Sequence, residues 1–146
     1  MLSGCSDFTL GIKDEKINSF LANLRKHDNF VIAAICGGPL FLAKAGLLKN
    51  KKYTCSLYYN MMELFDFFEM DNFIPAPVVV DQNIITAVGG AFNDFAVNVA
   101  RKLGYQCNDI IFKGYTNAWK KEDYYAYLSE EDLNDFKNEF IQFIKK

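Results

Sequence analysis

The chain has 146 residues, of which 51% are hydrophobic, and its formal net charge is −2. This length suits one domain with a substantial core, and the interspersed acidic and basic residues form no basic stripe that would predict nucleic-acid binding. No apolar run approaches the ~20 residues that a membrane helix needs, and no leader peptide is recognisable, so we expect a cytoplasmic protein without a membrane partner.

The four cysteines, at positions 5, 36, 55 and 107, show no C-x-x-C spacing, and the chain contains a single histidine. The usual zinc-ligand sets are therefore not available. We expect four free thiols, with no metal ion and no cofactor.

The first elements are a turn and a surface helix. Met1–Phe8 has the pattern of the end of a strand running into a glycine turn, and Asp14 is a candidate helix N-cap. The spacing predicts a helix that buries one apolar stripe and ends near His27, which we interpret as a solvated terminal residue. The stripe comprises Ile17, Phe20, Leu21 and Leu24.

A buried strand followed abruptly by a helix is predicted at residues 31–43. Val31–Ile35 is a continuous apolar run, Cys36 follows it, and Gly37-Gly38-Pro39 leads into a helix. A cysteine at the end of an apolar strand is often only a small core residue. Here the glycines permit a tight turn and the proline suits a first helical turn, which favours a nucleophile presented at the carboxyl end of a sheet.

The middle of the chain predicts a short strand, an aromatic helix and a hairpin. The short strand is Tyr53–Cys55, and Leu57–Met70 carries a helical apolar stripe that we interpret as core or subunit interface. Pro77–Val80 and Ile84–Ala87 are predicted to form a hairpin. The stripe comprises Met61, Leu64, Phe65 and Phe68.

The last part of the chain predicts two helices and one strand. Gly89-Gly90 precedes an amphipathic helix over 92–103 that Gly104 closes, and a strand is predicted at 109–112. Ser129 is a candidate cap for a final helix whose apolar stripe runs from Leu133 to Ile144. Alternating strands and helices predict a sheet that is covered on both faces.

These segments together resemble the ThiJ/PfpI superfamily. The resemblance lies in residues 33–39 with the helix and Lys-rich turn that follow, in 79–87 with Gly89-Gly90, and in Met1–Cys5, which is similar to the glycine turn of that superfamily. It covers about residues 1 to 104. The superfamily includes intracellular protease/amidase-like proteins and the Parkinson-associated deglycase, within the class I glutamine amidotransferase-like fold.

The resemblance implies an α/β three-layer sandwich, with a mostly parallel sheet flanked by helices, as a single domain over residues 1–146. The superfamily's first strand, helix and strand, with a glutamate that contacts the nucleophile, have no counterpart here. The sequence is then a fragment, a truncated gene product or a chain that another chain completes. We favour a fragment, because an open central sheet edge would promote association.

The resemblance also assigns the site. It implies that Cys36 is the nucleophile, that the N–H groups of Gly37 and Cys5 hold an oxyanion, and that four further residues contact substrate. The histidine of the superfamily follows the cysteine, where this chain has Gly37, or ends the next strand, where it has Ser56. The missing histidine and glutamate leave open whether the protein is an enzyme. The substrate-contacting residues would be Gly4, Ser56, Gly89 and Gly90.

Three functions remain open. The first is a cysteine-dependent, protease/amidase-like or deglycase-like enzyme that acts on a small carbonyl or amide substrate. The second is a redox- or electrophile-sensing stress protein in which Cys36 is oxidised and Cys5 resolves it. The third is a noncatalytic interaction module. A homodimer is expected in each case, with a small molecule or electrophile as the other partner.

Overall fold

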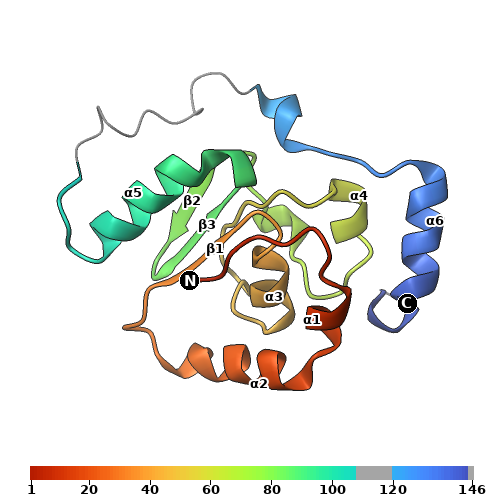
Figure 1. Cartoon of the computed structure of the whole chain (residues 1–146), viewed down its shortest axis with the longest axis horizontal. Coiled ribbons are helices and arrows are strands. Elements are labelled where there is room, and N and C mark those ends of the chain that lie inside the picture. The colour runs from red at the N-terminus through yellow and green to blue at the C-terminus, as the bar shows by residue number, and fades with distance from the viewer. Residues whose placement is uncertain (108–119, 145–146) are drawn as a thin grey trace.

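A three-stranded sheet forms the centre of the structure, a computed structural model that describes residues 1–107 and 120–144. Its strands are β1 (Ile32–Ile35), β2 (Val78–Asp81) and β3 (Ile84–Ala87), in the order β1-β3-β2 (Figure 1). β1 pairs with β3 in parallel, and β2 pairs with β3 antiparallel. The predicted hairpin is therefore confirmed, and the buried strand before Cys36 lies against it.

Helices cover both faces of this sheet. α5 (Phe92–Lys102) lies on one face, and α3 (Pro39–Lys44) with α2 (Glu15–Asn23) lies on the other (Figure 1). Ala33 belongs to the cluster packed under α5, whereas its neighbours Ile32 and Ala34 belong to the cluster that includes α3. A strand buried on both faces has this alternation. The α/β fold with flanking helices is confirmed.

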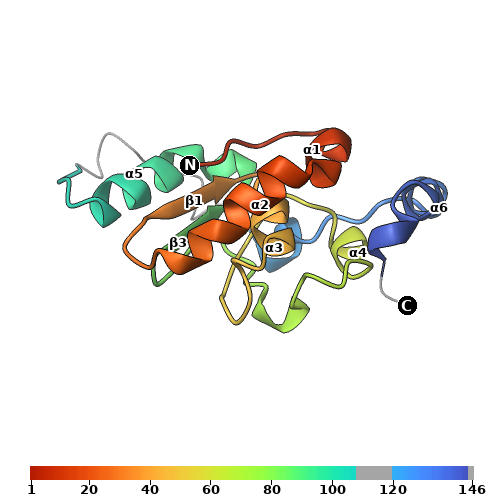
Figure 2. The same ribbon diagram turned by 90° about the horizontal axis from the view of Figure 1, so that it is seen from below.

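The remaining helices lie at the end of the molecule opposite α5. They are α1 (Thr9–Lys13), α4 (Tyr59–Met62) and α6 (Glu130–Glu139), and Figure 2 shows α4 and α6 far from α5. Both predicted caps are confirmed, because Asp14 accepts from the N–H groups of Lys16 and Ile17, and the Ser129 hydroxyl accepts from Asp132 N at 3.1 Å. These caps fix where α2 and α6 begin.

Two predicted elements of the middle segment differ from the structure. Tyr53–Cys55 is not a strand: Tyr53 forms an isolated bridge with Phe73, and Thr54 N then donates to the Thr86 hydroxyl at 2.9 Å. The acceptor is a side-chain oxygen of β3 and not a backbone carbonyl, so Thr54 forms no ladder with that strand. Of the predicted helix at 57–70 only α4 forms, although its apolar stripe is buried or partly buried in the core as expected.

The other differences concern helix faces and ends. On α2, Phe20 is 64% exposed while Leu21 is buried, and on α5 the buried residues are Phe95 and Val97 rather than the full predicted stripe. α6 ends at Glu139, before the last part of its predicted stripe. The strand predicted at 109–112 lies outside the described residues.

The outer edge of β1 is paired by a single residue. Leu2 N donates to Ala33 O at 2.7 Å and Ile35 N donates to Leu2 O at 3.3 Å, so Leu2 continues the sheet in parallel with β1. The start of the chain thus behaves as the end of a strand, as expected. It also brings residues 3–6 to the carboxyl end of β1, where Cys36 lies.

Candidate active site around Cys36

Cys36 occupies a sharp turn between β1 and α3. Its φ is 62°, in the left-handed region, where non-glycine residues cost about 1–3 kcal/mol and persist only if surrounding contacts hold them. Those contacts are hydrogen bonds from Cys36 N to Ala87 O at 2.9 Å and from Ser56 N to Cys36 O at 3.0 Å. Three segments of the chain therefore fix the backbone at which the thiol is presented.

Two glycines leave room for the Cys36 side chain. A Cβ atom at Gly4 would lie 2.4 Å from Cys36 Cβ and 3.1 Å from its Sγ, and one at Gly89 would lie 3.2 Å from the Sγ. Side chains at either position would press on the thiol. Gly4 and Gly89 therefore lie against Cys36, whereas Gly90 is exposed in the turn that precedes α5.

The backbones of Gly37 and Cys5 lie side by side. A Cβ atom at Gly37 would be 2.6 Å from Cys5 O and 3.8 Å from Cys5 N. Within the described part of the chain, neither Gly37 N–H nor Cys5 N–H donates a hydrogen bond. Two unpaired N–H groups beside a thiol are the donors that an oxyanion hole requires.

Ser56 lies on the other side of the thiol. Its hydroxyl oxygen accepts from Gly89 N at 2.7 Å, and a Cβ atom at Gly89 would contact both this oxygen and the Cys36 Sγ. Because the oxygen acts as the acceptor in this bond, the hydroxyl proton remains available to a third group. The structure thus brings Cys36, Gly37, Cys5, Gly4, Gly89 and Ser56 together, and it leaves Gly90 outside the group.

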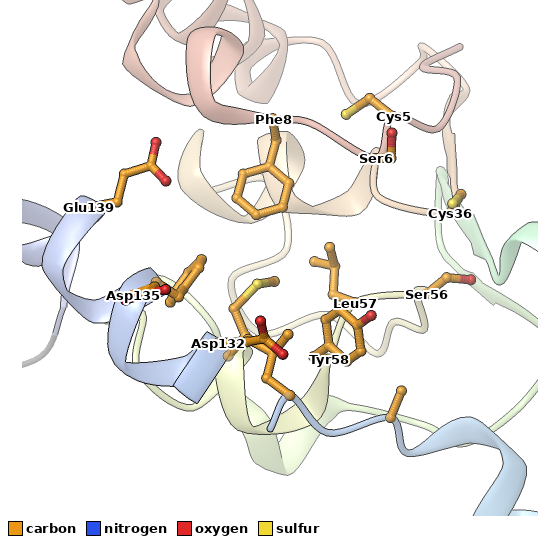
Figure 3. A pocket seen from close by; sticks show the side chains of 14 residues that line it. Cys5, Ser6, Phe8, Cys36, Ser56, Leu57, Tyr58, Asp132, Asp135 and Glu139 are labelled. Carbon is orange, nitrogen blue, oxygen red and sulfur yellow. The ribbon is translucent and has the colours of Figure 1, made fainter. Parts of the chain in front are cut away.

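A pocket of about 610 Å³ opens beside Cys36. Figure 3 shows Cys5, Ser6, Cys36 and Ser56 at one end of it, Phe8, Leu57 and Tyr58 between, and three carboxylates of α6 opposite. Sequence reasoning missed these carboxylates. Their spacing on one face of the last helix was a usable signal, but nothing in the sequence showed that this helix packs beside Cys36. They are Asp132, Asp135 and Glu139.

The other thiols differ from Cys36 in their surroundings. Burial raises the pKa of the Cys55 thiol to about 12, and this side chain is 1% exposed with its Sγ 3.2 Å from Met62 Sδ. The pKa of Cys5 is raised by burial, by the neighbouring Cys36 and by Asp7. All four cysteines are free thiols. Cys55 is therefore protected from reagents that attack thiolates.

His27 does not take part in the pocket. It is exposed at the end of a short 3₁₀ turn, as expected, and stacks on Phe30 with ring centroids 5.0 Å apart. Within residues 1–107 and 120–144, no group of three or more His, Cys, Asp or Glu side chains could hold a metal ion. Over the same residues, no helix is long and apolar enough to cross a membrane.

A model of the DJ-1/PfpI family matches residues 11–102, which include the elbow, the hairpin and α5. The chain belongs to the DJ-1/PfpI family. Two relatives from Bacillus subtilis, both named as uncharacterized proteases, are similar to it: YoaZ, 36% identical over 99 residues, and YdeA, 33% identical over 85 residues. The matches cover 66% and 58% of this chain, but only 47% and 43% of the relatives.

Among solved structures, a two-domain protein of Anabaena variabilis with DJ-1/ThiJ/PfpI-like and ferritin-like domains is similar to the chain. The match has a TM-score of 0.53 at 24% identity and covers 67% of this chain and 28% of the other. It supports the DJ-1/PfpI fold alone. The resemblance stated from the sequence is therefore confirmed.

Proposed function

We propose that this DJ-1/PfpI-family protein is a cysteine-dependent enzyme in which Cys36 attacks the carbonyl carbon of a small substrate. The observation that carries the proposal is the left-handed backbone of Cys36, held beside two unpaired N–H groups at the mouth of a pocket. This arrangement supports nucleophilic addition, because the attacking sulfur and the donors for the developing oxyanion share one site.

The first step needs no base beyond solvent. The Cys36 thiolate forms a bond to the carbonyl carbon, the carbonyl π electrons move to oxygen, and the N–H groups of Gly37 and Cys5 donate to that oxygen. The Ser56 hydroxyl proton can donate to the same intermediate or to a leaving group. Addition to an aldehyde or ketone ends there as a reversible hemithioacetal, once the oxygen takes a proton from water. With an activated ester, the alcohol or phenol leaves as the C=O bond re-forms, and water then hydrolyses the thioester.

Cleavage of an amide requires a proton donor in the site. The departing amine must be protonated, and a positioned acid or base contributes about 10²–10⁴-fold to such steps. The described lining residues include no histidine. Reactive carbonyl compounds and activated acyl groups are therefore better substrates for this site than amides.

The acidic wall of the pocket favours neutral or cationic substrates. Asp132, Asp135 and Glu139 face the site from α6, and the described lining residues include no lysine, arginine or histidine. Negative potential in a cleft repels anions and lowers their local concentration. We therefore expect small neutral or positively charged carbonyl compounds to be preferred over carboxylates and phosphates.

Mass spectrometry of adducts with small aldehydes and ketones, and turnover assays with activated esters and amides, test this proposal. Cys36→Ala should remove both the adducts and the turnover, and Cys107→Ala serves as a matched control that should retain them. Turnover that persists in Cys36→Ala would overturn the proposal. The homodimer and the cytoplasmic location stay predictions.

A further inference from the structure

We propose that Cys5 is the resolving thiol of Cys36 and that the two form a reversible intramolecular disulfide. The inference rests on Cys36 being the reactive thiol of the proposed function, and it adds a redox regulation of that site. Oxidation would block the nucleophile and a dithiol reductant would restore it.

The backbone of Cys5 is held against Cys36 on both sides. The preceding residue, Gly4, approaches Cys36 Cβ so closely that a Cβ atom there would be 2.4 Å away. The carbonyl oxygen of Cys5 lies against Gly37, the residue after Cys36. A Cβ atom at Gly37 would be 2.6 Å from that oxygen. The backbone of residues 4–5 therefore runs directly beside that of residues 36–37, so that a local adjustment of the N-terminal turn can bring the two β-carbons to the separation that a disulfide needs.

Both thiols are reachable by small oxidants. Cys5 and Cys36 are partly exposed and line the same pocket, whereas Cys55 is buried. In Figure 3 the sulfur of Cys5 does not point directly at Cys36. Bond formation therefore requires rotation about the Cα–Cβ bond of Cys5 together with a local adjustment of the N-terminal turn that carries it.

The pKa of the Cys5 thiol depends in part on Cys36. The negative charge of Cys36 is one reason why the pKa of Cys5 is raised, after burial. When Cys36 becomes a neutral sulfenic acid, this repulsion ends and Cys5 ionises more readily. Oxidation of Cys36 therefore removes one of the three causes that raise the pKa of Cys5, while burial and Asp7 remain.

The oxidant is a hydroperoxide. The Cys36 thiolate attacks one peroxide oxygen, the O–O bond breaks, and water or an alcohol leaves with a proton, giving the sulfenic acid. The Cys5 thiolate then attacks the sulfenic sulfur, the S–O bond breaks, and water leaves as the S–S bond forms. The two thiols lose two electrons in total, and the peroxide takes them.

Peptide mapping without reduction tests the pairing, because trypsin places the four cysteines in separate peptides. Cys5 falls in residues 1–13 and Cys36 in residues 27–44. After a small molar excess of hydrogen peroxide, the wild-type protein should lose two hydrogen atoms and yield these two peptides joined. Cys107→Ser should behave in the same way.

The variants give the complementary results. In Cys5→Ser the same dose should carry Cys36 on to sulfinic acid, a gain of two oxygen atoms that dithiothreitol does not reverse. In Cys36→Ser, Cys5 should stay unmodified. The inference is overturned if wild type and Cys5→Ser give the same oxidised Cys36 product without the joined peptides, or if Cys36 pairs with Cys107.

The mass readout is independent of turnover. A joined 1–13/27–44 pair in a protein that turns over no carbonyl substrate would support the disulfide and contradict the proposed enzyme. Turnover that depends on Cys36 but is lost irreversibly to peroxide, with no joined pair, would support the enzyme and overturn the disulfide.

Discussion

Gly4 and Cys36 meet so closely that a Cβ atom at Gly4 would lie 2.4 Å from Cys36 Cβ. Residues 32 positions apart in the chain therefore build one surface, and the absence of a side chain at Gly4 is what lets the nucleophile take its strained conformation. The N-terminal turn is in this sense part of the site.

Replacement of Gly4 should disturb the nucleophile. We expect Gly4→Ala to lower the alkylation rate of Cys36 at least several-fold and to cost about 1–3 kcal/mol of stability, the usual range for an overpacked site. A time course of iodoacetamide labelling measures the alkylation rate, and urea unfolding measures the stability. Ser3→Ala, at the exposed neighbouring residue, should change neither. Equal labelling of wild type and Gly4→Ala would show that Gly4 does not shape the site.

Ser56 offers a place to supply the missing base. Ser56→Ala should weaken turnover, because Gly89 N loses its 2.7 Å acceptor and the intermediate loses a donor. Ser56→His should raise turnover of acyl substrates, with a rate that increases as pH rises through about 6.5, where an unperturbed imidazole becomes neutral. A pH profile of turnover checks both variants. A Ser56→His profile identical to that of wild type would contradict the placement of Ser56 beside the reacting atoms.

The carboxylates of α6 should favour the reaction of Cys36 with cationic reagents over its reaction with anionic ones. Asp135→Asn and Glu139→Gln should each lower the ratio of Cys36 labelling by a cationic reagent to labelling by an anionic one, by roughly two- to fourfold at low salt. Added salt should shrink the difference. Glu131→Gln removes the same charge from the same helix at a residue that does not line the pocket, and it should have the smaller effect. If neither variant changes the cationic-to-anionic labelling ratio, the expected preference for neutral or cationic substrates is contradicted.

Alkaline pH should destabilise the fold through its buried acids. Burial raises the pKa of Cys55 from 9.0 to about 12, and it also raises the pKa of Tyr53. Below pH 9 the Cys55 thiol is protonated in both the folded and the unfolded state, so it adds no pH dependence. Between pH 9 and about 12 only the unfolded state releases the proton, so the free energy of unfolding falls as pH rises.

Urea unfolding from about pH 7 to about pH 11 measures this slope, which is at most about 1.4 kcal/mol per pH unit for each group. Cys55→Ala should flatten the slope, whereas Cys107→Ala should not. A stability that stays constant above pH 9 would contradict the burial of the Cys55 thiol as a protonated group.

The sequence was sufficient to predict the elbow, the hairpin and the helix caps. Each of these depends on local chemistry: an apolar run closed by glycines and proline, a turn between two β-branched runs, and a side-chain oxygen before a helix. The position of Cys36 and its neighbours Gly37, Cys5 and Gly4 also followed, because the resemblance linked segments that the sequence alone leaves apart.

The far wall of the pocket could not be predicted in this way. Asp132, Asp135 and Glu139 are held at the site by Phe136, on the same helix, and by Phe140, directly after it, which both pack against Phe8 and Phe65. Such aromatic contacts join residues that are distant in sequence, and no local pattern specifies the partner. Nor could the sequence show that Tyr53–Cys55 makes only an isolated bridge to Phe73, with Thr54 N bonded to the Thr86 hydroxyl.

The order in which the four cysteines react tests the central claim most directly. After limiting iodoacetamide near neutral pH, tryptic mapping should find Cys36 alkylated first and Cys55 last, with Cys5 and Cys107 between them. Preferential alkylation of Cys5 or Cys107 while Cys36 stays unmodified would contradict the assignment of Cys36 as the reactive centre.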